Sequence, residues 1–339
     1  MQLSRLWTLA LLATVILQPR ATRSSEPAID MFGDFRVRNE GIWDETTDQR
    51  IRSRFRARVG VGSDVTEDVR VAVRLATGSA SPTSANQTMT GAFSAKAIYI
   101  DRAYAEWNRS DGAPITAIAG KMPNPLFRAG GNQLIWDSDV SPEGFSVSYG
   151  AASKHATPLF ANANVFWIDE QATGDDILLF AAQAGPNIRI GDAGSLVIGG
   201  GYLHYTNPFQ NVEWRPIEAF AQFSTGNDEI GVTAFANAAV NLAEDDDTTA
   251  WLIGIQTRSG NWCFGYSYRH AEVFAVPQHF TDFNFAGGAT NASGHEISVS
   301  ATPVNGLALK LTEYFNTVGL VGPTSTYYSR LMFDVSLSF

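Results

Sequence analysis

Hydrophobic and polar residues alternate along almost the whole chain, and this period of two constrains the fold more than any other feature. Successive side chains of a β-strand point to opposite faces of a sheet, so each alternating run predicts a strand with one apolar and one polar face. We expect about sixteen strands, each close to the length that a tilted strand needs to cross a bilayer. They cover residues 30–42, 50–63, 67–78, 97–109, 115–122, 144–154, 158–168, 177–186, 194–206, 213–224, 229–240, 249–258, 261–271, 294–302, 306–316 and 326–339.

The connections between these runs alternate in length. Short connections occupy residues 62–68, 109–114, 224–228, 258–261 and 302–306. Between them are longer ones at residues 78–96, 123–143, 241–248 and 273–293. A barrel with short periplasmic turns and long external loops has this alternation, whereas a soluble β-sandwich has no reason for it. We therefore predict an all-β chain that forms a transmembrane antiparallel up-and-down β-barrel.

The first 25 residues predict a cleaved secretory signal peptide. Arg5 precedes an apolar run over residues 6–17, and small residues follow at 22–25. A run of roughly twelve apolar residues is too short to cross a bilayer as a helix, and no later stretch is longer. Residues 26–339 then form a single barrel domain. The one cysteine, Cys263, excludes an intramolecular disulfide, so strand pairing and packing must stabilise the fold.

Arginine recurs at every second position of one run, although the chain as a whole has a net charge of −10. That acidic balance argues against a nucleic-acid partner. In a barrel, the arginines face a water-filled lumen and the residues between them face lipid, where each charge would cost roughly 2–4 kcal/mol at mid-depth. We call these side chains the arginine ladder, and it comprises Arg36, Arg38, Arg50, Arg52, Arg54, Arg56, Arg58, Arg70 and Arg74.

Three acidic residues in the long connection 123–143 are candidate partners for the ladder. We expect this connection to fold into the lumen, where Asp137, Asp139 and Glu143 would narrow the pore and face the arginines. A basic wall opposite an acidic loop would create a field across the passage. The alternative is a polar external loop that never enters the lumen.

The chain ends on an alternating strand whose last residue is aromatic. Phe333, Val335, Leu337 and Phe339 share one face of this strand. The pattern looks like the C-terminal signal that the barrel-assembly machinery recognises in outer-membrane barrels, although an ordinary buried strand would also show it. Tryptophans near the strand ends suit the aromatic girdles of the two membrane interfaces.

Six segments of the chain resemble the bacterial family of putative porins. They are DFRVRNE, RIRSRFRARVGV, VAVRLATG, IDRAYAEW, AGKMPNPL and WDSDVSPEG, within residues 34–144. The whole chain is similar in strand rhythm to sixteen-stranded general diffusion porins. The resemblance implies a homotrimer in the Gram-negative outer membrane, among lipid and lipopolysaccharide, that lets small hydrophilic solutes diffuse passively. It carries a basic wall onto Arg52, Arg54, Arg56 and Arg74, and constriction acids onto Asp137 and Asp139.

Catalytic and metal-binding patterns are not evident. The five histidines lack metal-ligand spacing, and His295 and Glu296 are neighbours on an expected strand, where they would point to opposite faces. The acidic run 244–247 suits a solvated loop. We therefore expect no enzyme activity, no cofactor and no metal. Alternatives to a diffusion pore are a substrate-selective anion channel that uses the ladder as a binding stripe, a barrel-borne lipase, and a secreted β-sandwich adhesin.

Overall fold

The computed structural model of the 339-residue chain describes residues 29–109, 113–150, 157–191, 194–227 and 229–339. The predicted signal peptide, residues 1–25, lies outside the described residues. Within them, seventeen strands form one sheet, and β4 (Gln87–Thr88) is only a two-residue piece of a connection. None of the helices in these ranges is long and apolar enough to cross a membrane.

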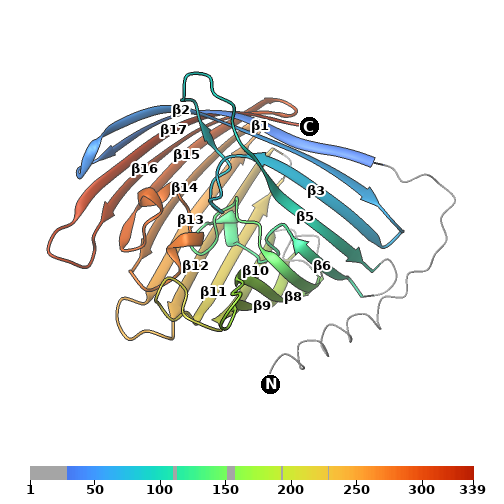
Figure 1. The fold of residues 1–339 in the computed structure, drawn as a ribbon. Coiled ribbons are helices and arrows are strands. Elements are labelled where there is room, and N and C mark those ends of the chain that lie inside the picture. The colour runs from blue at the N-terminus through green and yellow to red at the C-terminus, as the bar shows by residue number, and fades with distance from the viewer. Residues whose placement is uncertain (1–28, 110–112, 151–156, 192–193, 228) are drawn as a thin grey trace.

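The other sixteen strands close into an antiparallel barrel (Figure 1). The last strand pairs with the first, so that Asp34 lies opposite Ser338 and Asp44 opposite Tyr328. Closure gives every strand two partners and leaves no open sheet edge. The prediction of this fold is confirmed, and each expected run overlaps one strand. The strands are β1 (Ile29–Asp44), β2 (Thr47–Asp64), β3 (Val69–Thr77), β5 (Ile98–Asn108), β6 (Ile115–Lys121), β7 (Glu143–Tyr149), β8 (Leu159–Asp169), β9 (Ile177–Ile190), β10 (Gly194–Tyr205), β11 (Pro216–Gly226), β12 (Ile230–Asn241), β13 (Thr249–Ser259), β14 (Trp262–Ala271), β15 (Ala292–Val304), β16 (Leu307–Val318) and β17 (Thr326–Ser338).

The connections at the two ends of the barrel differ in length, as the alternation predicted. One end carries short turns such as residues 260–261 and 305–306. The other end carries the three longest connections, which are residues 78–97, 122–142 and 272–291. The first connection at that end, residues 45–46, is the exception, because β1 and β2 stay paired almost to the turn and β2 continues well beyond the end of β3.

The height of the barrel wall varies around its circumference. The strands β1 and β2 have 16 and 18 residues, whereas β6 and β7 have 7 each. Above the end of β3, the short strand β4 takes its place beside β2, with Gln87 opposite Phe55 and Thr88 opposite Arg54. The connection 78–97 therefore continues the wall at the point where the arginine ladder rises above β3.

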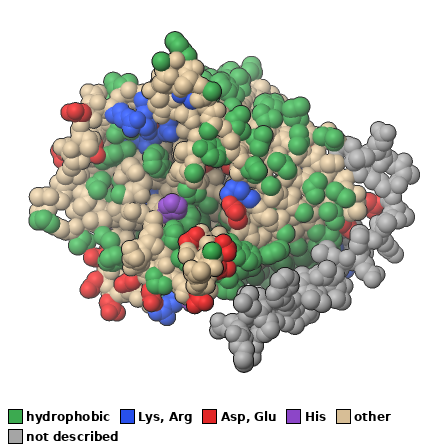
Figure 2. Space-filling view, in the orientation of Figure 1, with side chains coloured by type: hydrophobic (Ala, Val, Ile, Leu, Met, Phe, Trp, Pro, Cys, Tyr) green, Lys and Arg blue, Asp and Glu red, His purple; other side chains and the backbone are tan. Residues whose placement is uncertain are grey.

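Large apolar side chains cover the outer face of the strands (Figure 2). On β14, Trp262, Phe264 and Tyr266 are exposed at alternate positions. On β17, Phe333 and Leu337 are exposed, while Asp334 between them is buried inside. This distribution is the one that a barrel needs when lipid surrounds it and water fills it, because apolar surface costs nothing against hydrocarbon.

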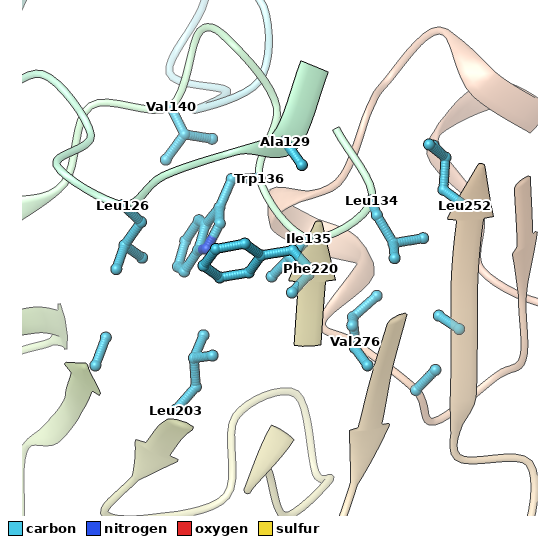
Figure 3. Packing of buried hydrophobic residues seen from close by; sticks show 14 of the residues in the cluster. Leu126, Ala129, Leu134, Ile135, Trp136, Val140, Leu203, Phe220, Leu252 and Val276 are labelled. Carbon is cyan, nitrogen blue, oxygen red and sulfur yellow. The ribbon is translucent and has the colours of Figure 1, made fainter. Parts of the chain in front are cut away.

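An apolar core fills part of the barrel interior (Figure 3). Connections 122–142 and 272–291 fold inward and pack against the inner faces of β8–β13. Trp136 and Leu134 from the first connection are buried in this core with Phe220 from β11 and Val276 from the second connection. The side of the interior along β8–β13 is therefore apolar and packed, and charged side chains line the wall of β1–β3.

Candidate pore lining

The arginine ladder follows the inner face of β2 and continues onto β1 and β3. In the β1–β2 register, Arg36 lies opposite Arg56, and Arg38 lies opposite Arg54. Like charges directly opposite each other in an antiparallel pair destabilise it, so this arrangement needs counter-charges nearby.

Carboxylates on the same strands provide most of those counter-charges. Asp34 on β1 accepts hydrogen bonds from Arg58 Nε at 2.7 Å and from Arg56 Nε at 3.0 Å. On β17, Asp334 binds Arg38 with both oxygens, at 2.7 Å to Nε and 2.8 Å to Nη2. Bidentate pairs of this kind are the stronger form of arginine–carboxylate contact.

Glu40 joins three arginines from two neighbouring strands. Its carboxylate is buried and binds Arg52 Nε, with Arg54 Nη1 at 3.6 Å and Arg330 Nη2 of β17 at 2.5 Å. The segment DFRVRNE thus places Asp34, Arg36, Arg38 and Glu40 on one inner face. These partners follow the same alternation as the ladder, and this signal could have identified them from the sequence.

Of the remaining ladder residues, Arg74 is buried in the wall, and Arg50 and Arg70 lie nearer the ends of the barrel. Arg74 of β3 binds Asp101 of β5. Arg70 binds Asp30 at 2.6 Å and Asp64 at 3.1 Å at the end with the short turns, where both carboxylates are exposed and Arg70 is partly exposed. Arg50 is exposed near the opposite tip of β2. Arg50 and Arg70 therefore stand at the two mouths and not in the middle of the wall.

Several inward arginines were not predicted from the sequence. Arg102 of β5 lies opposite Arg74 and donates a hydrogen bond to Ser141 Oγ at 3.2 Å. Arg330 is almost fully buried and contacts Glu40. Both occupy inward positions of their strands, so the alternation of inward and outward residues along each strand could have identified them from the sequence.

One of the three loop acids reaches the arginine ladder. Asp139 Oδ1 lies 3.2 Å from Arg56 Nη1 and 3.2 Å from Arg58 Nη1. Burial by itself would raise the pKa of Asp139, but the charges of Arg56, Arg58 and Arg36 outweigh it and lower that pKa below its usual value. Asp139 therefore stays ionised and joins connection 122–142 to the wall of β2.

The other two acids have different partners. Asp137 accepts hydrogen bonds from the backbone N–H groups of Asp139 at 2.8 Å and Phe283 at 3.1 Å, so it joins the two inward connections. Burial, followed by the nearby charge of Asp282, raises the pKa of Asp137 well above its usual value. Glu143 is exposed at the start of β7 and binds Lys121 at 2.7 Å. The structure thus places Glu143 in the wall, away from the ladder, and not in the connection.

Other chemistry that the sequence raised does not assemble into a site. His295 faces outward and its Nδ1 lies 2.9 Å from the hydroxyl of Tyr266, whereas Glu296 faces the lumen. The described residues contain no group of three or more histidine, cysteine, aspartate and glutamate side chains that could hold a metal ion. The polar lining of the lumen is therefore the candidate site.

Solved structures with the same barrel are outer-membrane channels and porins. OprB of Pseudomonas putida has a TM-score of 0.61 at 13% identity, with 92% of this chain and 94% of that chain covered. The channel DcaP of Acinetobacter baumannii has a TM-score of 0.56 at 12% identity, with 95% and 100% covered. A triple mutant of the Rhodopseudomonas blastica porin has a TM-score of 0.55 at 14% identity, with 92% and 100% covered. At such low identity, these matches establish the shared barrel fold.

The family profile described as "Putative porin" matches residues 21–251, which is more than half of the chain. The chain belongs to this family. Its members are channel proteins of the Gram-negative outer membrane and not enzymes, so the barrel is a channel protein of that membrane. No curated protein sequence matches the chain significantly.

Proposed function

We propose that the barrel is a water-filled channel through which small hydrophilic solutes and ions diffuse passively. The division of the interior into two parts carries this proposal. The apolar core closes the side along β8–β13, and the charged wall of β1–β3 and β17 remains polar. A passage for hydrated solutes would therefore run beside the arginine ladder, where Asp139 and connection 122–142 narrow it.

A preference for anions is the second candidate function, and the balance of charge along the wall favours it. Five carboxylates form ion pairs with the arginines of this wall, and they are Asp34, Glu40, Asp101, Asp139 and Asp334. The inward arginines outnumber these carboxylates. These arginines are Arg36, Arg38, Arg52, Arg54, Arg56, Arg58, Arg74, Arg102 and Arg330. An excess of fixed positive charge in a narrow polar passage raises the local concentration of anions.

The assembly and maturation of the channel belong to the same proposal. We infer a homotrimer in contact with lipid and lipopolysaccharide, from the resemblance to general diffusion porins. Residues 1–25 would be removed on export, and residues 26–339 would form the barrel. The exposed outer face of Phe333, Leu337 and Phe339 supports recognition of the last strand by the barrel-assembly machinery.

Single-channel recording in a planar bilayer, with folded protein and a salt gradient, tests the proposal. Long-lived current steps that grow in proportion to salt concentration are expected for an open diffusion pore. If the arginines of the ladder outweigh the carboxylates, the reversal potential should show a preference for anions. Saturation of the current already at low salt would instead indicate that anions bind along the ladder. Protein that is shown to be folded and yet produces no steps would refute the channel proposal.

A further inference from the structure

A second polar site lies inside the barrel, away from the arginine ladder. It is a cavity of about 150 Å³ between the tip of connection 122–142 and the inner faces of β12–β16. Charged side chains of both signs line it together with an aromatic ring. The lining includes Arg269, Glu296, Lys310, Asp282, Gln133 and Phe285.

Arg269 of β14 is a buried cation in this cavity, and it has no carboxylate partner among the residues that the structure describes. The residue is only 3% exposed. Nη1 donates to the carbonyl of Gln133 at 3.3 Å, Nη2 donates to that of Leu134 at 3.5 Å, and the guanidinium lies 4.7 Å from the centre of the Phe285 ring. Its Nε is buried without a hydrogen-bond partner among the described residues. A buried cation with only carbonyl and ring contacts is costly, and an anion beside it would relieve that cost.

Carboxylates lie in the same cavity but do not neutralise Arg269. In the part of the chain that the structure describes, Arg269 has no ion pair with Glu296 or Asp282, and its hydrogen bonds go to backbone carbonyls. In the β14–β15 register, Arg269 lies opposite Gly294, so Glu296 is its diagonal neighbour, roughly 7–8 Å away along the backbone. Lys310 of β16 is exposed, near the end with the short turns, and it stands at the mouth of the cavity. Two cations and two carboxylates thus surround one small polar space.

We propose that this cavity binds a small zwitterion of the amino-acid type. The carboxylate of the ligand binds Arg269 with support from Lys310, and its ammonium group binds Glu296 with support from Asp282. A simple anion would be repelled by Glu296, and a simple cation would be repelled by Arg269. A cavity of about 150 Å³ has room for a small amino acid such as alanine. This binding does not require conduction, so it stands apart from the proposed channel function.

Calorimetry on the folded barrel in detergent tests this inference with a matched set of three solutes. L-alanine carries both charges, propionate lacks the ammonium group, and ethylamine lacks the carboxylate. L-alanine is expected to bind at least about tenfold more tightly than either of the others, because each loses a hydrogen-bonded contact to a charged group. Equal affinity for L-alanine and propionate would overturn the zwitterion assignment, and failure of L-alanine to bind folded protein would overturn the site.

Two substitutions locate the binding in the cavity. Arg269→Gln and Glu296→Gln are each expected to weaken L-alanine binding by about tenfold or more. Arg128→Gln is the control, because Arg128 belongs to the same connection and contacts the carbonyl of Trp136 at 3.2 Å without lining the cavity. If Arg269→Gln does not fold, Glu296→Gln decides the question alone. Unchanged L-alanine affinity in folded Glu296→Gln would overturn the proposal.

Discussion

The contact between Asp139 and the arginine ladder should control both the position of connection 122–142 and the charge of the passage. The substitution Asp139→Asn keeps the shape of the side chain and removes its negative charge. Asp139 Oδ1 lies 3.2 Å from Nη1 of both Arg56 and Arg58, and all three side chains are mostly buried. The change therefore removes two charge-assisted contacts at once.

The size of the effect follows from what Arg56 and Arg58 retain. A hydrogen bond to a charged group contributes roughly 1.5–3 kcal/mol, and removal of one partner of a buried pair costs roughly 3–5 kcal/mol. Both arginines keep Asp34, at 2.9 Å and 2.7 Å, and neither arginine side chain is fully buried. We therefore expect a loss of about 1–2 kcal/mol in the contact between the connection and the wall, which is a factor of about 5–30 in its docked population.

Single-channel recording in a planar bilayer measures both consequences. Asp139→Asn should show more frequent current fluctuations, because connection 122–142 leaves the wall more often, and a reversal potential shifted toward anions. Glu143→Gln is the control, because Glu143 binds exposed Lys121 at 2.7 Å and does not touch the ladder. Unchanged fluctuations and an unchanged reversal potential in Asp139→Asn would refute the reasoning.

Three further predictions concern the wall, the connection and the last strand. Arg54→Ala with Arg56→Ala should move the reversal potential toward cations, and an unchanged value would count against a pore lined by the ladder. Asp137→Asn should make the barrel less resistant to thermal unfolding at acidic pH, because its single amide oxygen can accept only one of the N–H groups of Asp139 and Phe283, which Asp137 accepts with Oδ1 and Oδ2 respectively. The raised pKa of Asp137 means that wild-type stability falls as pH rises from the usual carboxyl range through that pKa, and this fall should be smaller in Asp137→Asn, as pH-dependent thermal melts would show. Phe339→Ala should lower the folded fraction seen as heat-modifiable migration in detergent gels, and a normal folded fraction in cells would contradict an assembly role.

The interior core explains why the passage is expected along one wall only. Trp136, Leu134 and Val276 need apolar partners, and they find them on the inner faces of β8–β13, where Phe220 and Leu203 are buried. Gly130 permits this close packing, because its φ is 61° and an added Cβ would lie 2.2 Å from the Phe235 ring. The charged wall is not covered by this core, because its arginines and carboxylates pair with one another and not with apolar side chains.

Strand positions and faces could be predicted because they depend on local pattern. Alternation in the segment RIRSRFRARVGV was enough to place Arg52, Arg54, Arg56 and Arg58 on the inner face of β2, and the alternating connection lengths were enough to place the long connections at one end. The first connection at that end, residues 45–46, is short although the others are long, because two long strands take the place of a loop.

The partners of the ladder depended on contacts between distant parts of the chain. Arg38 and Asp334 are 296 residues apart in sequence, and only the closure of β1 onto β17 brings them together. Asp139 and Asp137 are two residues apart, yet one binds the ladder and the other binds the connection 272–291. Local periodicity determines which face a side chain occupies, because that depends on backbone geometry alone. The contacts across the lumen were decided by the tertiary structure, because they depend on strand register, barrel closure and the way two long connections pack against each other.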